Sequence, residues 1–359
     1  MGQRTLLAVL LVFGVVASLP IGWAAGGQPA PDPSDQAALQ EAASWIGHAE
    51  KVDAEYHYVM TCKLRLLLFW TGRDDVGGGF VRIGNAVGDE RQRMIQILFG
   101  SDPAKAPRAI NRWGAGTEVL WASDSGQSVT SAFFGFMKSS KGQSVGAMQK
   151  ELSREKANGD HLFEGIISRV DGDRALSATL PYASSQDYDL HQYAEAETAT
   201  LQQLATNPSR HIRRLDGEAR YTCPRAGGFL STTLELMEAA AAGKPTPVSL
   251  CYIYNARRYT ATLVSVSPVA ERTVHVNLRG TSGGFDRTYR HLLEGHFAVV
   301  AEDTGSKSLF NILMGTEGSL RGTPLQITYG PNWWFQVILN LAPDSSPPVN
   351  ASPGRPGQS

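Results

Sequence analysis

One short motif in this chain could carry nucleophilic catalysis. The segment Gly280–Gly284, GTSGG, fits the pattern G-x-S-x-G. In α/β-hydrolases this pattern places a nucleophilic serine on a sharp turn between a strand and a helix. Ser282 is therefore a candidate nucleophile, with a histidine farther along the chain as its base. However, too little chain follows the motif to complete such a fold, so we expect an exposed loop and keep a serine hydrolase as an alternative.

A metal or cofactor site is not predicted. His291 and His296 are five positions apart, whereas a zinc helix of the H-E-x-x-H type needs two histidines four apart on one face. The chain also contains no C-x-x-C pair. We therefore expect no metal and no cofactor.

The stretch Phe69–Ile83, FWTGRDDVGGGFVRI, joins two carboxylates to three consecutive glycines. Asp74 and Asp75 could contact a ligand, and glycines let a backbone approach one closely. A phosphate-binding loop would continue into a helix, but the next residues alternate like a strand. We therefore interpret the stretch as a hairpin connection with a bulge, and keep the two aspartates as candidate ligand-binding residues.

Trp333 and Trp334 form an aromatic cluster near a predicted turn at Gly330–Asn332. Such residues can line an apolar pocket or support a sugar ring, although they more often fill a core. We retain both tryptophans as candidate ligand-binding residues.

The N-terminus has the features of a secretory signal peptide. A basic start precedes an apolar run, and Gly22 and Ala24 are small residues where a signal peptidase cleaves. We expect residues 1–24 to be removed and the protein to be exported, periplasmic or extracellular, with no transmembrane segment after cleavage. The alternative is an uncleaved anchor.

The charge and cysteine contents exclude some classes of protein. The chain has 33 basic and 34 acidic residues, so the overall balance gives no electrostatic footprint for nucleic acid or for an anionic membrane. It has three cysteines, Cys62, Cys223 and Cys251. One disulfide is possible in an oxidising compartment, and Cys223 with Cys251 is the nearer pair in sequence, but three reduced cysteines remain an alternative.

Most of the chain alternates like β-strands, with a few helices inserted. Helices are predicted over about 36–52, 146–159, 190–208 and 228–243, the last closed by Gly243. Hairpins are predicted at Asp171-Gly172 and around Asn255. Strands do not alternate with crossover helices. We therefore predict an α+β protein, mainly antiparallel β, built as a barrel or curved sheet with a few packed helices.

The region from Gly228 to Leu341 resembles an uncharacterised family of exported bacterial β-rich domains of unknown function. Three segments carry this resemblance: GFLSTTLELMEAAAAGKP, VSLCYIYNARRYTATLVSV and FAVVAEDTGSKSLFNILMGTEGSLRGTPLQI. The chain departs from the family pattern at Leu309, where a proline is expected, and near Val299, where a tryptophan is expected. The resemblance implies a periplasmic antiparallel β-barrel and no catalytic residues.

These observations define an expected organisation and function. We expect a linker at 25–35, one β-rich unit at 36–342 that could comprise coupled halves at 53–185 and 220–342, and a disordered tail at 343–359. The predicted function is non-catalytic: binding of an apolar or lipid-like ligand, or a role in envelope maintenance. A protein-interaction or assembly module is a further alternative.

Overall fold

The computed structural model describes most of the β-rich region and none of the predicted signal peptide. The described residues are 32–46, 51–66, 69–85, 92–102, 104–106, 110–123, 126–140, 163–172, 174–180, 211–215, 227–280, 282–332 and 334–343. The expected helices at 146–159 and 190–208, and nearly all of the expected tail, lie outside these residues.

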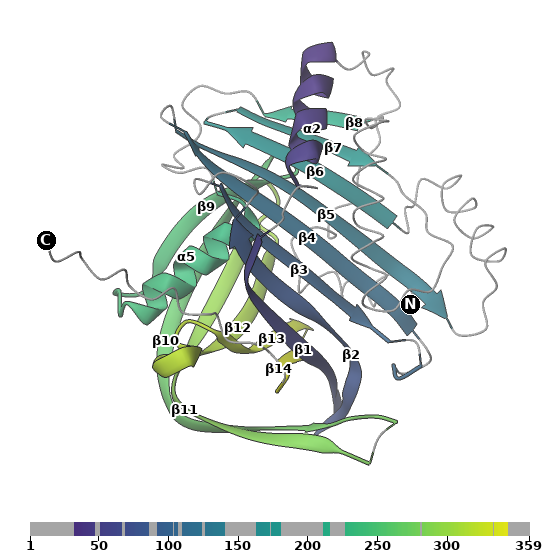
Figure 1. Ribbon diagram of the computed structural model, residues 1–359, viewed down its shortest axis with the longest axis vertical. Helices are drawn as coiled ribbons and strands as arrows, with labels where there is room; N and C mark the ends of the chain where they lie inside the picture. Colours follow the sequence, from purple (N-terminus) through teal and green to yellow (C-terminus); the bar gives the residue numbers. More distant parts are fainter. Residues whose placement is uncertain are drawn as a thin grey trace, which may run out of the picture.

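Antiparallel strands dominate the described structure, as the sequence predicts. Fourteen strands form one barrel-like sheet in the order β8-β7-β6-β5-β4-β3-β2-β1-β14-β13-β12-β11-β10-β9 (Figure 1). The strands are β1 Lys51–Leu66, β2 Phe69–Asn85, β3 Gln92–Ser101, β4 Ile110–Ser123, β5 Gly126–Ser140, β6 Phe163–Asp171, β7 Arg174–Leu180, β8 His211–Leu215, β9 Val248–Tyr254, β10 Arg257–Asn277, β11 Gly284–Ala301, β12 Lys307–Gly315, β13 Pro324–Asn332 and β14 Phe335–Leu341.

The two halves of the sequence meet in the middle of this sheet. Strand β1 pairs with β14, the last of the described strands, from Tyr58 opposite Leu341 to Leu64 opposite Phe335. Every other pairing joins strands that are consecutive along the chain, so β1 with β14 is the one pairing between strands from opposite halves. This statement concerns the described strands.

The curvature brings the outer strands of the two halves into contact. Asn255, in the β9–β10 turn, accepts a hydrogen bond from Ser177 Oγ at 2.6 Å and donates its backbone N–H to Ser168 Oγ at 3.2 Å. Ile253 packs in a small buried cluster with Val170 and Ala175. The sheet is therefore nearly closed.

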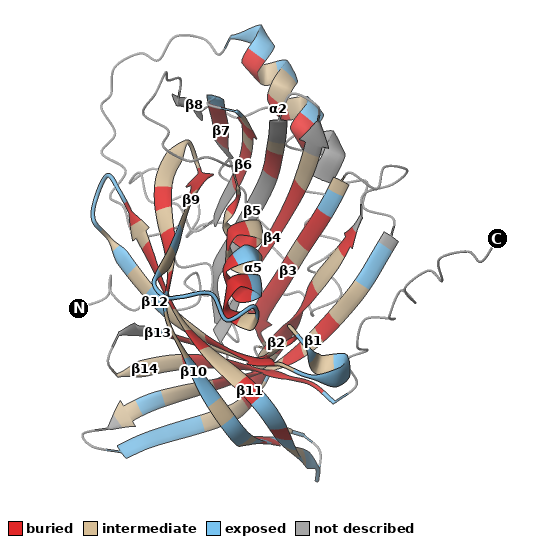
Figure 2. Cartoon of the chain, turned by 90° about the vertical axis from the view of Figure 1, so that its left-hand side faces the viewer, coloured by how far each residue is buried: buried red, intermediate tan, exposed pale blue. Residues whose placement is uncertain are grey.

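Two described helices lie on opposite faces of the sheet. Helix α5, Phe229–Ala241, lies between the two walls of the curved sheet (Figure 2). Its buried side chains, which include Leu230 and Met237, belong to the main hydrophobic core. Helix α2, Pro33–Ile46, packs on β4–β7, and its Glu41 pairs with Arg169 at 2.7 Å. The alternation along β6 places Arg169 on the face opposite Ser168 and Val170, so α2 covers the outside.

The turn chemistry explains why several predicted elements are confirmed. Gly172 has φ 58° in the β6–β7 hairpin, and Gly243 has φ 67° just after α5. Asn255 and Ala256 have φ 51° and 48°, which is the left-handed pair that a two-residue hairpin needs. Asparagine and glycine adopt this conformation more readily than other residues.

Three predicted boundaries are wrong. Helix α2 begins at Pro33 rather than near 36, because Asp32 caps it: Asp32 Oδ1 accepts the backbone N–H of Ser34 at 2.9 Å. The predicted turn at Gly330–Asn332 is instead the irregular end of β13, which has a register shift after Tyr329.

The third error concerns the glycine-rich stretch, which is not a hairpin connection. Residues 69–85 form the single strand β2. A Cβ on Gly77 would lie 2.0 Å from the carbonyl oxygen of Gly100, and one on Gly79 would lie 1.8 Å from that of Leu98. The glycines therefore allow close approach of the β3 backbone. The predicted bulge is present, since the β1–β2 register shifts between Met60 and Cys62.

Candidate functional site

An apolar cavity lies between helix α5 and the inner face of the sheet. It has a volume of about 130 Å³. Its walls come from β1, β2 and β3 on one side, from β12, β13 and the segment before β13 on another, and from one face of α5. The lining residues are Tyr56, Val81, Ile83, Ile95, Ile97, Phe99, Phe229, Leu230, Thr233, Leu234, Met237, Phe310, Ile312, Gly322, Pro324, Ile327 and Tyr329.

The chemistry of this lining is uniform. Among the side chains, only the hydroxyl groups of Thr233, Tyr56 and Tyr329 are polar, and no lining residue carries a charge. Phe229, Leu234 and Ile327 are only partly buried, so the cavity is accessible from their side. The site can therefore hold an apolar group but offers nothing to pair with a charged one.

Helix α5 is anchored at this site by a buried carboxylate. Glu118, on β4, is fully buried. Its Oε1 accepts the backbone N–H of Leu230 at 2.7 Å, and its Oε2 accepts that of Ser231 at 2.9 Å. These N–H groups belong to the first turn of α5, where a helix has no internal acceptors for them. Glu118 therefore replaces a capping side chain and fixes the helix end against the sheet.

Two opposing effects set the protonation of Glu118. Burial raises its pKa, because a charged carboxylate loses its hydration in the protein interior, while the hydrogen bonds from the helix end favour the ionised form. Burial prevails, and the pKa rises from 4.5 to about 7. Gly228 is fitted to this arrangement, since a Cβ at that position would lie 2.4 to 2.5 Å from the Glu118 carboxyl atoms.

The two predicted aspartates lie elsewhere and hold protein groups. Asp74 accepts hydrogen bonds from Thr61 Oγ1 at 3.0 Å and from the backbone and side-chain nitrogens of Asn277, each at 3.2 Å. Asp75 is buried, pairs with Lys105 at 2.9 Å, and accepts the backbone N–H of Arg279 at 2.7 Å. Both therefore fasten the end of the β10–β11 hairpin to β2.

Ser282 is exposed in the loop between β10 and β11. Two antiparallel strands flank it, so the strand–turn–helix geometry of a hydrolase nucleophile is missing. His291 lies against Glu317, and His296 Nδ1 is 2.9 Å from Asn311 Oδ1. Within the described residues, no histidine is hydrogen-bonded to Ser282.

Of the two tryptophan candidates, the structure describes Trp334, which is not among the residues that line the cavity. Trp333 lies outside the described residues. Trp334 is half-buried at the turn before β14, with its ring 5.9 Å from that of Phe335. The cavity was missed at the sequence level because its residues come from six separate segments. The regular spacing of Leu230, Leu234 and Met237 on α5 is the one local signal, and the same spacing is typical of a helix that packs on a core.

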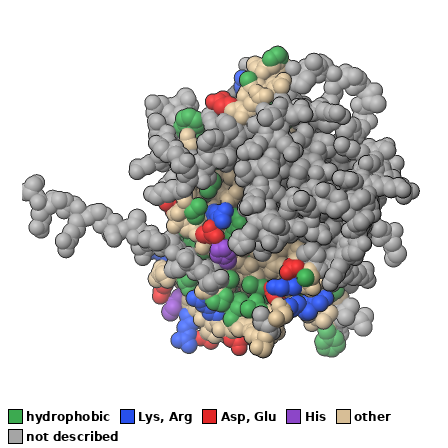
Figure 3. Space-filling view, turned by 45° about the vertical axis from the view of Figure 1, so that its right-hand side comes forward, with side chains coloured by type: hydrophobic (Ala, Val, Ile, Leu, Met, Phe, Trp, Pro, Cys, Tyr) green, Lys and Arg blue, Asp and Glu red, His purple; other side chains and the backbone are tan. Residues whose placement is uncertain are grey.

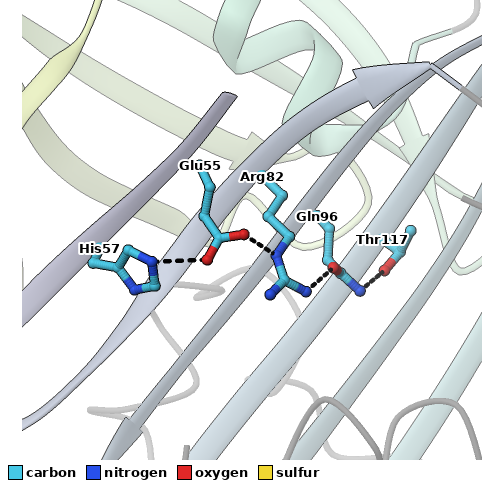
Figure 4. A network of polar contacts seen from close by, with 5 residues as sticks. All are labelled: Glu55, His57, Arg82, Gln96 and Thr117. Atoms are coloured by element: carbon cyan, nitrogen blue, oxygen red, sulfur yellow. Dashed lines mark hydrogen bonds and ion pairs between the residues drawn. The ribbon is translucent and has the colours of Figure 1, made fainter. Parts of the chain in front are cut away.

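A row of polar side chains crosses the opposite face of the same strands (Figure 4). Glu55 contacts His57 at 2.7 Å and Arg82 at 2.6 Å, Arg82 reaches Gln96 at 3.4 Å, and Gln96 reaches Thr117 at 3.3 Å. Burial would raise the pKa of Glu55, but the charge and hydrogen bond of Arg82 lower it. The row is a set of cross-strand pairs that stabilises β1–β4.

The cysteines differ in state. Cys251 is disulfide-bonded, and Cys223, the cysteine nearest to it in sequence, lies outside the described residues. Cys62 is a free thiol, and burial raises its pKa to about 12. Within the described part of the chain, no group of three or more histidine, cysteine or acidic side chains is placed to hold a metal ion.

The described helices include none with the length and apolar character needed to span a bilayer.

Comparison with known proteins gives structural neighbours without an established function. No family model matches the sequence, and no curated protein matches it. The fold is similar to a β-barrel-like protein of the domain of unknown function DUF1849 from Brucella abortus, at 10% identity and a TM-score of 0.40, over 80% of this chain and 96% of that one. A protein of Parabacteroides distasonis described as a putative lipoprotein has 7% identity and a TM-score of 0.22, over 82% and 96% of the two chains.

These neighbours are an uncharacterised β-barrel-like domain and a lipoprotein candidate, in keeping with the resemblance to an uncharacterised β-rich domain family. Neither similarity is strong enough to carry an argument about function. The inference of function therefore depends on the chemistry of the cavity.

Proposed function

We propose that this is an exported, non-catalytic protein that binds an apolar or lipid-like ligand in the cavity between α5 and the sheet. The observation that carries this proposal is the uncharged lining of that cavity. An apolar group that enters it leaves water without losing hydrogen bonds, which is favourable by about 0.8 kcal/mol for each methylene group buried.

The size of the cavity limits the part of the ligand that it holds. Its volume of about 130 Å³ is close to that of engineered protein cavities of about 150 Å³ that remain dry and bind benzene. The cavity therefore accommodates one ring or a short alkyl segment. The remainder of a longer acyl chain would extend past Leu234 and Ile327 on the accessible side.

The first experiment is extraction of the purified protein with organic solvent, followed by mass spectrometry. A stoichiometric apolar molecule would support the proposal. The delipidated protein is then titrated with a polarity-sensitive fluorescent fatty acid, and binding of this probe is measured from the change in its emission. Absence of both a co-purified molecule and saturable probe binding would exclude this function.

A cavity-filling variant assigns the binding to this site. Leu234→Trp places a large ring at the cavity, and we expect it to weaken probe binding at least about tenfold, since it removes the space for about two methylene groups or more. Glu238→Trp is the matched control, because it adds the same side chain on the exposed face of the same helix. Equal affinity in both variants would place the ligand elsewhere.

A further inference from the structure

Large exposed apolar side chains are concentrated at one end of the β1–β2 hairpin. Phe69 is 77% exposed, Trp70 41% and Leu64 40%. Across the described residues, only three other large apolar side chains are comparably exposed, and none lies at this end of the hairpin: Val52 is at the opposite end of β1, Val264 is on β10 and Leu309 is on β12. Burying apolar area is the main favourable contribution to folding. A cluster of exposed apolar side chains on one hairpin therefore indicates a surface that binds a partner.

The neighbouring end of β14 enlarges this surface. The backbone N–H of Arg65 donates to the carbonyl oxygen of Trp334 at 2.8 Å, and Leu64 lies opposite Phe335 in the ladder. Trp334 is half-buried. We call the group formed by Leu64, Phe69, Trp70, Trp334 and Phe335 the apolar tip.

The apolar tip presents side chains on both faces of its hairpin. Phe69 pairs with Leu66, and Trp70 with Arg65. Successive residues of a strand point to opposite faces, so Phe69 and Trp70 project in opposite directions. A flat protein surface would cover only one of them. A lipid interface surrounds whatever is inserted into it and covers both.

Basic residues outnumber acidic ones next to the apolar tip. The sequence from Lys63 to Arg73 contains three basic residues and no acidic one, and the sequence from Gly330 to Gln336 contains no charge. The two aspartates that follow Arg73 are held by Lys105 and by the β10–β11 loop. Although the whole chain is close to neutral, this end of it is locally basic. Figure 3 shows hydrophobic side chains at the lower end of the described surface, with Lys and Arg side chains beside them and Asp and Glu side chains among these.

We propose that the apolar tip docks the protein on the surface of an anionic lipid membrane. Phe69 and Trp70 insert at the level of the headgroups, where aromatic side chains are favoured, and the nearby Lys and Arg side chains attract anionic phosphate groups. The β1–β2 end would then face the membrane while the rest of the sheet stays in water. This docking is independent of any ligand in the cavity.

Co-sedimentation with lipid vesicles tests the docking. The purified protein keeps its mature N-terminus, as produced in the cell. It is mixed with vesicles of phosphatidylglycerol and phosphatidylcholine, and separately with vesicles of phosphatidylcholine alone. We expect binding to the anionic vesicles that weakens as salt is added. The double variant Phe69→Ser/Trp70→Ser should lower the partition coefficient at least about tenfold, because it removes two side chains whose burial is each favourable by about 1.5 kcal/mol or more.

A matched variant distinguishes docking through the apolar tip from nonspecific binding through other exposed apolar side chains. Val264→Ser/Leu309→Ser removes two side chains of similar exposure, 46% and 52%, from other strands, and should leave vesicle binding unchanged. Equal loss in both double variants, or retention of binding by Phe69→Ser/Trp70→Ser, would overturn the proposal. So would self-association of the protein through the tip without vesicle binding, which would identify a second copy as the occupant.

A labelled variant keeps the test valid even if the double variant folds poorly. Phe69→Cys is coupled to a polarity-sensitive fluorophore. The emission maximum of this fluorophore should move to shorter wavelength when anionic vesicles are added. An unchanged spectrum in the presence of vesicles contradicts insertion at this position. Cys62 is half-buried with a raised pKa and Cys251 is disulfide-bonded, so labelling is directed to the new thiol.

Discussion

Replacement of Glu118 by glutamine should remove a pH dependence of stability that follows from its burial. In the folded protein the pKa of Glu118 is raised from 4.5 to about 7. Between these values the folded protein holds a proton that the unfolded chain has released. The unfolded state therefore binds fewer protons, and the free energy of unfolding falls as the pH rises through this window. Below about pH 4.5 the contribution to stability is fully present, and above about pH 7 it is lost.

The size of this effect follows from the same two pKa values. One pH unit of difference corresponds to about 1.4 kcal/mol, so a rise from 4.5 to about 7 corresponds to roughly 3 kcal/mol. Glutamine has nearly the shape of the protonated carboxyl, and its oxygen can still accept one of the two N–H groups of α5. Glu118→Gln should therefore equal the wild type near pH 4.5 and exceed it by up to about 3 kcal/mol above pH 7.

Urea denaturation followed by tryptophan fluorescence, at several pH values from 4.5 to 8, measures this difference. Other titrating groups contribute equally to both proteins and cancel. Glu238→Gln, the same replacement on the exposed face of α5, is the control. A flat difference for Glu118→Gln would refute the raised pKa. A wild type that gains stability over the variant as pH rises would show that the helix end, rather than burial, dominates.

Three further perturbations test other parts of the structure. Gly79→Ala should lower the free energy of unfolding in urea by about 1–3 kcal/mol or prevent folding, because the added Cβ would meet the Leu98 carbonyl oxygen. Gly72→Ala is the control on the same strand. Its Cβ would have its nearest neighbour at 3.4 Å, so it should leave the free energy of unfolding nearly unchanged. Asp75→Ala removes the partner of Lys105 and of the Arg279 N–H, so amide hydrogen exchange should increase at 277–283, and unchanged protection there would contradict the tether. Cys62, with its pKa raised to about 12, should react with a disulfide reagent at pH 8 far more slowly in the folded protein than in urea, and equal rates would contradict its burial.

The sequence determines the class of fold through periodicity and turns. Alternation along the strands, Asp171-Gly172 and Asn255 at hairpins, and Gly243 after α5 are local signals, and each acts where it was expected. The glycines at 77–79 show the limit of this reasoning. Glycine serves both turns and close backbone contacts, and only the position of β3 distinguishes the two.

The candidate site was less accessible to sequence reasoning for a related reason. Asp74 and Asp75 have the residue types of a ligand site, but their partners are Asn277 and Arg279, some 200 positions away. The role of Glu118 is invisible in the sequence, because a single acidic residue in a strand gives no local sign that it caps a distant helix. The cavity likewise depends on which strands face α5, which is a property of the closed sheet.

The pairing of β1 with β14 has a consequence for how the chain is completed during synthesis. Strand β1 is among the first strands made and its partner is the last. Until residues 335–341 emerge, each half of the protein has an unpaired strand edge where the other half belongs, and such edges associate readily with other chains. Contacts between residues so far apart in sequence also form slowly. Folding must therefore pass through an intermediate with two open edges, and a chain that lacks residues 335–341 would retain them.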